Sequence, residues 1–240
     1  MAKKQSSSTR KPVYKIHSEE TDLDPILIPI ADGKGEGVSL RYDGIYDKIR
    51  EARREDDPAL PQGIWKKTLK KADFKEIEKL ATNALIHQSK DFQLMAWLIE
   101  SWLELYHLKG LNRGLKLMNG LVIRFWDEGF PKIEGDDSDY RIAPFHWMNE
   151  KLSDRVAEIK ITQGSEYDAN TYSFADWREA LALERLAQKA DGSGFLEQAQ
   201  SEGRPILRIL QDAINHNALS FYEDLGTEIS LSLQELPIMS

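Results

Sequence analysis

The sequence predicts an all-α protein, a globular multi-helix bundle of antiparallel helical hairpins. From about residue 43 onward, apolar residues recur at the three- and four-residue spacing of helices, and no convincing alternation of apolar and polar residues interrupts them. Short breaks containing glycine, proline or acidic residues separate the helical segments. Helices joined by short loops pack as antiparallel neighbours, so these observations together favour a bundle.

The first 24 residues differ in composition from the rest of the chain. This segment is basic at its start, lacks the apolar stretch of a signal peptide, and is expected to be a flexible tail. Residues 25–240 are expected to form the all-helical domain, and the polar segment ITQGSEYDANTYS suggests a subdivision near residues 160–172. Pro25 and Pro29 argue against a helix at the start of this domain.

Helical segments are predicted by apolar spacing and by start signals. Their residue numbers are 43–54, 73–87, 90–108, 111–126, 142–159, a helix that opens near Asp176, and 204–225. Asp73 with Glu76 resembles a capping box, and Asp176 with Glu179 repeats this arrangement. The 90–108 segment is apolar on nearly all sides, which is typical of a helix at the centre of a bundle, and Gly110 is expected to end it.

The composition excludes several classes of site and partner. The chain has no cysteine, which excludes disulfides, thiolate metal sites and cysteine nucleophiles. Its net charge of −8 disfavours a general nucleic-acid binder, because such proteins usually carry a basic face. No apolar run reaches the length that spans a bilayer, so direct membrane insertion is not expected. Without a signal peptide, the expected location is the cytoplasm.

No motif for catalysis, metal binding or cofactor binding stands out. The five histidines have no second ligand at metal-binding spacing on their own helix, and no Gly-x-Ser-x-Gly nucleophile motif is present. The glycine-rich GKGEG lacks the Lys-Ser or Lys-Thr pair of a phosphate loop. The acids at 136, 137 and 139 lack the glycine and the final glutamate of a calcium loop. The sequence therefore predicts no enzyme, no metal and no cofactor.

One charged stretch, REARREDDPALPQGIW at residues 50–65, is too charged for a core and unlike a generic linker. Its two prolines predict a rigid, extended loop after the 43–54 helix. The candidate functional residues in it are Arg53, Arg54, Glu55, Asp56 and Asp57. They belong either to a surface that faces a partner or to a buried network that fixes the loop, and the sequence does not decide between the two. Trp65 is likewise either an anchor for its own loop or an exposed contact.

The order of four segments resembles a known family. These segments are RYDGIYDKIREARREDDPALPQGIW, KKADFKEIEKLATNAL, QSKDFQLMAWLIESW and GLNRGLKLMNGLVIRFWDEGFP. Together they are similar to the N-terminal ImpA-type domain of TssA proteins, over residues 29–152, and ITQGSEYDANTYSFADWREA resembles the next segment of that family. Phe74 and Phe92 stand where many relatives have tryptophan and leucine, which are mild apolar exchanges.

The resemblance implies an assembly protein of a bacterial type VI secretion system. TssA proteins are cytoplasmic and link the membrane complex, the baseplate and the growing contractile sheath and tube, so these are the expected partners. The ring-forming C-terminal domain of the family is not expected in this chain, which would then be a fragment or a short member; homo-oligomer formation is left open. The alternative is a generic helical interaction module unrelated to secretion.

Overall fold

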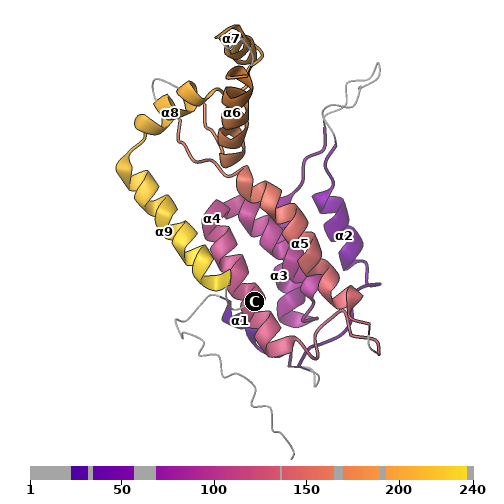
Figure 1. The fold of residues 1–240 in the computed structure, drawn as a ribbon. Helices are drawn as coiled ribbons and strands as arrows, with labels where there is room; N and C mark the ends of the chain where they lie inside the picture. The colour runs from indigo at the N-terminus through magenta and orange to yellow at the C-terminus, as the bar shows by residue number, and fades with distance from the viewer. Residues whose placement is uncertain are drawn as a thin grey trace, which may run out of the picture.

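The structure is a computed structural model that describes residues 23–31, 35–56, 69–135, 137–164, 170–189 and 193–236. In this part of the chain every regular element is a helix, which confirms the all-α class. The helices are α1 (Asp24–Leu27), α2 (Ile45–Arg53), α3 (Phe74–His87), α4 (Phe92–Phe125), α5 (Asp139–Ala157), α6 (Phe174–Ala187), α7 (Ser193–Ser201), α8 (Leu207–Asn215) and α9 (Leu219–Glu235). Figure 1 shows their arrangement.

The long helix α4 is in fact two helices that fold back on each other. Its direction changes at His107, whose φ of 54° and ψ of −132° are not helical. Beyond this residue the second half packs antiparallel to the first, so that a Cβ atom on Gly114 would lie 2.7 Å from Ile99 Cγ2. The predicted break between the 90–108 and 111–126 segments is therefore confirmed.

The expectation that Gly110 ends the first of these helices is wrong. The turn falls at His107, and Gly110 already lies inside the second half of α4. Gly110 allows the backbones of the two halves of α4 to come close together. A Cβ atom at this position would lie 1.8 Å from the carbonyl oxygen of Trp102. Glycine is needed here because it has no side chain, and the hairpin can close only where both chains come this near.

The first half of α4 is the centre of the bundle, as its nearly all-round apolar sequence predicts. Leu94, Met95 and Trp102 have no exposed surface. Helices α3 and α5 pack against α4, helix α2 packs against α3, and α9 packs against α4 from the outer side (Figure 1). A single large apolar cluster joins α1 to α5.

A second, smaller cluster joins α6, α7 and α8. Its buried members are Leu183, Ala199 and Ile206. The large cluster extends along the chain to Ile159, so the predicted subdivision near 160–172 would fall between the two clusters. That the two parts form separate folding units stays a prediction.

The predicted helix at 204–225 is wrong, because the chain breaks between α8 and α9. Asn217 lies in this break, where its Oδ1 accepts a hydrogen bond from the Gln163 amide at 2.9 Å and its Nδ2 donates to the Gln163 carbonyl at 3.0 Å. These two bonds tie the break to the segment before α6, and the extended backbone of Ala218 (ψ 142°) separates the two helices. The sequence prediction also lacks helix α7, and α9 extends ten residues beyond Leu225, to Glu235.

The helix starts follow the sequence signals only in part. Asp73 caps α3 as predicted, its side chain accepting from the Glu76 amide at 3.0 Å. The capping box of α6 is Ser173 with Asp176, one turn before the predicted pair of Asp176 with Glu179. Helix α1 contains Pro25, which corrects the expectation of no helix there; proline is tolerated in a first turn, where its missing N–H would have no partner.

Candidate functional site

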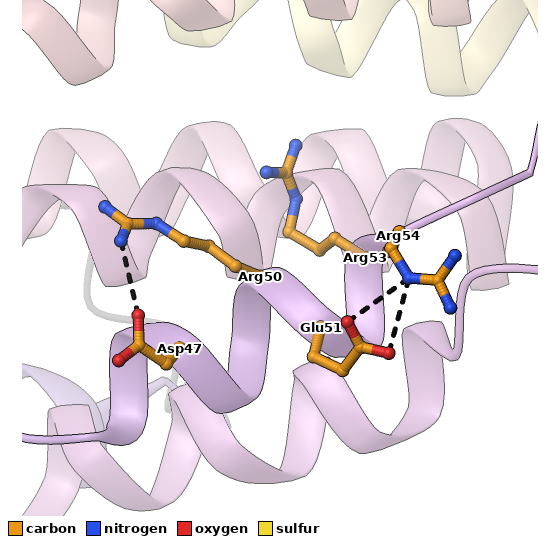
Figure 2. A pocket seen from close by; sticks show the side chains of 5 residues that line it. All are labelled: Asp47, Arg50, Glu51, Arg53 and Arg54. Carbon is orange, nitrogen blue, oxygen red and sulfur yellow. Dashed lines mark hydrogen bonds and ion pairs between the residues drawn. The ribbon is translucent and has the colours of Figure 1, made fainter.

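The candidate residues lie where α2 ends and the charged loop begins. Arg53 is the last residue of α2, and Arg54 caps the helix in extended conformation. Figure 2 shows that these two neighbouring side chains point in different directions, with Arg54 beside Glu51 on α2. Asp57 and Trp65 lie outside the described residues.

Arg53 reaches across to the central helix and pairs with a buried carboxylate. Its Nε donates to Glu100 Oε2 at 2.6 Å and its Nη2 donates to Glu100 Oε1 at 3.0 Å. Glu100 is only 2% exposed. Arg155 of α5 lies 3.3 Å from the same carboxylate and 2.5 Å from Glu104. The four charges form one network that joins α2, α4 and α5.

Aromatic rings enclose this network. The Arg53 guanidinium lies 5.6 Å from the ring centre of Trp97 and 4.9 Å from that of Trp147. A guanidinium held over two indole rings keeps its planar fork aimed at the carboxylate, which is why arginine suits such a site. This geometry favours the loop-fixing alternative for Arg53.

Arg54 occupies a different environment on the surface. Its side chain is about half exposed, and its guanidinium lies 2.5 Å from Asp56 and 3.2 Å from Glu51. Hydrogen bonds from Lys70 and then from Arg54 lower the pKa of the Glu51 carboxyl. Exposed ion pairs of this kind contribute little to the free energy of folding, so they orient Arg54 more than they stabilise the fold.

The two acids Glu55 and Asp56 hold the returning chain at residues 69–72. The Asp56 amide donates to the Lys70 carbonyl at 3.0 Å, and the Lys70 amide donates to Asp56 Oδ2 at 2.9 Å. The Ala72 amide donates to Glu55 Oε1 at 3.4 Å. Thus the two ends of the charged loop lie side by side, and acids of the charged motif provide the contacts.

The outer side of α2 carries a shallow depression. It is lined by Asp47, Arg50, Glu51, Arg53 and Arg54 (Figure 2). Arg50 is 62% exposed, and its ion pair with Asp47 is long, at 3.4 Å. We call the exposed residues Arg50 and Arg54 the α2 arginine pair. Because both guanidinium groups face solvent, they are available to a partner in a way that Arg53 is not.

A second polar cluster has no role assigned by the sequence. Lys90 is 1% exposed, and its Nζ donates to the carbonyls of Ile26 at 2.6 Å and Leu85 at 2.7 Å. Burial lowers the pKa of this lysine to about 8. Its ammonium thus ties α1 and the end of α3 to the start of α4. In the sequence, Lys90 stands out only as part of the segment QSKDFQLMAWLIESW, which carries the family resemblance. Nothing in that segment predicts that its ammonium group is buried.

The next residue, Asp91, begins α4. Its Oδ1 accepts from the amides of Gln93 at 2.8 Å and Leu94 at 3.1 Å, and its Oδ2 accepts from the Tyr46 hydroxyl at 2.7 Å. Burial is the main cause that raises the pKa of this carboxyl to about 6, although these hydrogen bonds act in the opposite direction. Asp91 therefore connects Tyr46 of α2 to the first turn of α4.

Replacing Asp91 by Asn tests this pKa. In the folded chain the carboxyl binds its proton up to about pH 6, whereas the ordinary value is 3.8. Between those values the folded state holds more protons than the unfolded state, so stability conferred by the protonated form is complete below about pH 4 and is lost as the pH rises through 6. We expect the unfolding free energy of the native chain, minus that of Asp91→Asn, to fall by on the order of 2 kcal/mol from pH 4 to pH 7.

Urea unfolding of both proteins at a series of pH values measures this difference. The variant is a suitable reference because asparagine retains an oxygen to cap α4 and does not titrate. A difference that rises with pH would mean that the carboxylate, and not the acid, is favoured in the folded chain.

Two general absences hold for the described residues. None of the helices there is long and apolar enough to cross a bilayer. In the same part of the chain, no three histidine, aspartate or glutamate side chains gather as metal ligands would.

Comparison with known proteins decides the family. The family model described as "ImpA, N-terminal, type VI secretion system" matches residues 27–150, just over half of the chain. This chain belongs to that family. The ImpA match spans α2 with its charged end, both halves of α4 and most of α5, and it confirms the resemblance read from the sequence. No curated protein is similar enough to this chain to match.

A solved structure has the same fold as this ImpA-family chain. It is described as the "N-terminal domain including the conserved ImpA_N region of the TssA component of the type VI secretion system from Burkholderia cenocepacia". The similarity covers 98% of this chain and 83% of that chain, with a TM-score of 0.75 and 22% sequence identity. The likeness therefore extends beyond the ImpA match to the helices after α5.

Proposed function

We propose that this chain is a non-enzymatic assembly component of a type VI secretion system. In this role it acts in the cytoplasm and links the baseplate, the membrane complex and the contractile sheath and tube during tail biogenesis. The observation that carries the proposal is the ImpA family match over residues 27–150. The absence of any catalytic motif in the sequence supports a binding role over an enzymatic one.

The α2 arginine pair is the partner-binding part of this proposal. Arg54, directly after α2, is oriented by Glu51 and Asp56, and Arg50 lies four residues before it, on α2. A surface whose side chains are already oriented loses less entropy on binding. Arginine is also enriched among the residues that dominate interface energies. Arg53 lines the same depression, but its guanidinium is paired with Glu100, so we assign it to holding α2 and not to the partner.

An affinity experiment tests the proposal. The immobilised chain is exposed to lysate that contains the secretion-system components, and captured proteins are identified by mass spectrometry. We expect sheath, tube, baseplate or membrane-complex proteins to be enriched. If none is enriched while the chain is folded, the proposed linking role is wrong for this chain.

The variant Arg50→Glu with Arg54→Glu locates the contact. Both side chains are exposed, so the melting temperature should stay within about 2 °C of the native value, while capture should fall about 10-fold or more. Arg208→Glu on α8 is the matched control, because this arginine is 71% exposed and its ion pair with an acid is also long. Equal capture by both variants would overturn the assignment of the α2 arginine pair.

A further inference from the structure

Helix α9 turns a polar side toward the bundle. Ser232 Oγ donates to Asn112 Oδ1 at 2.5 Å, and Asn119 Nδ2 donates to Glu235 Oε2 at 3.0 Å. Asn112 also donates to the Glu228 carbonyl at 3.1 Å. Asn112 and Asn119 are seven residues apart, and so are their partners Glu228 and Glu235, in the same order. Helix α9 therefore runs parallel to the second half of α4. Its attachment to the bundle is thus made largely by buried polar groups.

Three apolar residues, two in the second half of α9 and one directly after its end, lie beside this contact and face solvent. Ile229, Leu233 and Leu236 follow one another at spacings of four and three residues, which places them on one side of the helix. They are 43%, 58% and 47% exposed. We call these three residues the α9 stripe. In Figure 1 the helix lies at the edge of the molecule, and α4 is the element it packs against.

An apolar stripe of this spacing normally faces a core, with polar residues on the opposite side. In the second half of α9 the polar side faces the bundle instead, so the pattern suits a helix that lies between the bundle and a second apolar surface. Contiguous exposed apolar residues with polar neighbours are typical of protein contact sites.

The charges of α9 indicate what kind of partner fits. Its charged residues are all acidic: Glu223, Asp224, Glu228 and Glu235. Two copies of this chain, each with a net charge of −8, repel each other, which disfavours a second copy. Glu228 and Glu235 bond to Asn112 and Asn119 of the bundle, whereas Glu223 and Asp224 are exposed at the start of α9. A helix with lysine or arginine beside its own apolar stripe would meet opposite charge at that end.

We propose that the α9 stripe is a docking surface for a basic amphipathic helix of another protein. The apolar residues of that helix recur every three or four positions and pack on Ile229, Leu233 and Leu236. Its flanking basic residues pair with Glu223 and Asp224, the exposed acids of α9. The surface shares no residue with the α2 arginine pair, so this inference stands apart from the proposed function.

Two synthetic helical peptides of equal length serve as probes. One has leucine at the helical stripe positions and lysine elsewhere, and the other has glutamate in place of lysine. Fluorescence anisotropy with the whole chain should show binding of the lysine peptide with a Kd on the order of 10 μM, and binding of the glutamate peptide at least about 10-fold weaker.

A variant separates the stripe from general charge attraction. Ile229→Ser with Leu233→Ser should weaken binding of the lysine peptide about 10-fold or more, because apolar contact is lost while the net charge is unchanged. Leu186→Ser is the matched control: this leucine is 51% exposed on α6 and lies away from the stripe. It should alter the affinity by less than about 2-fold.

Two results would overturn the proposal. Equal affinity of both variants for the lysine peptide would mean that the chain attracts it by net charge alone. The second result is a dimer in light scattering that Ile229→Ser with Leu233→Ser converts to a monomer; the occupant would then be a second copy.

A stability control accompanies the binding experiment. The melting temperature of the stripe variant should stay within about 2 °C of the native value, since the replaced side chains face solvent.

Discussion

Arg53→Glu is expected to lower the unfolding free energy by about 3–5 kcal/mol, and the melting temperature by on the order of 10 °C. The new carboxylate would face Glu100, which is buried and would keep only its contact to Arg155. Two like charges at this depth cannot both be solvated. Thermal unfolding followed by circular dichroism measures the effect.

Arg54→Glu is the control, because the Arg54 side chain is about half exposed. The melting temperature of this variant should stay within about 2 °C of the native value. Equal losses of stability in Arg53→Glu and Arg54→Glu would show that the Arg53–Glu100 pair does not stabilise the fold more than an exposed arginine does.

A rescue distinguishes the ion pair from general damage to α2. Arg53→Met combined with Glu100→Leu removes both charges and fills the space with apolar groups. Replacing a buried pair in this way is often neutral, so the double variant should regain most of the stability lost in Arg53→Glu.

Gly110→Ala is expected to destabilise the chain as much as Arg53→Glu does, lowering the unfolding free energy by about 3 kcal/mol or more. The added methyl group would lie 1.8 Å from the Trp102 carbonyl oxygen, and backbone on both sides leaves no flexible group to move aside. The two halves of α4 would have to separate at the centre of the bundle. Urea unfolding compared with the native chain gives the free-energy difference.

The matched control is Gly226→Ala in α9, where a Cβ atom would meet nothing within 4 Å. Alanine is the better helix former, so this change should stabilise the chain by about 0.5–1 kcal/mol. A Gly110→Ala protein as stable as the native chain would mean that the hairpin of α4 is more open than the close approach at Gly110 implies.

The sequence and the structure agree best where the deciding interactions are local. The spacing of apolar residues predicts α2, α3 and both halves of α4, because that spacing follows directly from helical geometry. The Asp73 cap is found for the same reason: donor and acceptor are three residues apart. The family resemblance also rests on local runs and is confirmed by the ImpA match.

The candidate site shows where local reasoning ends. Arg53 and Arg54 are adjacent and chemically identical, so no sequence pattern assigns one to a buried network and the other to the surface. The difference depends on Glu100, which is 47 positions away from Arg53. Lys90 is a similar case, because its carbonyl partner on Ile26 lies 64 positions away. The break between α8 and α9 likewise depends on the distant Gln163.

The sequence by itself therefore determined the all-α class, most helix positions, the absence of cysteine chemistry and the family. Only the tertiary structure decided which charges are buried, why Gly110 must be glycine, and that α9 turns its apolar stripe away from the bundle. The physical reason is that helix formation depends on neighbours within a few residues, whereas burial and ion pairing depend on which distant segments meet.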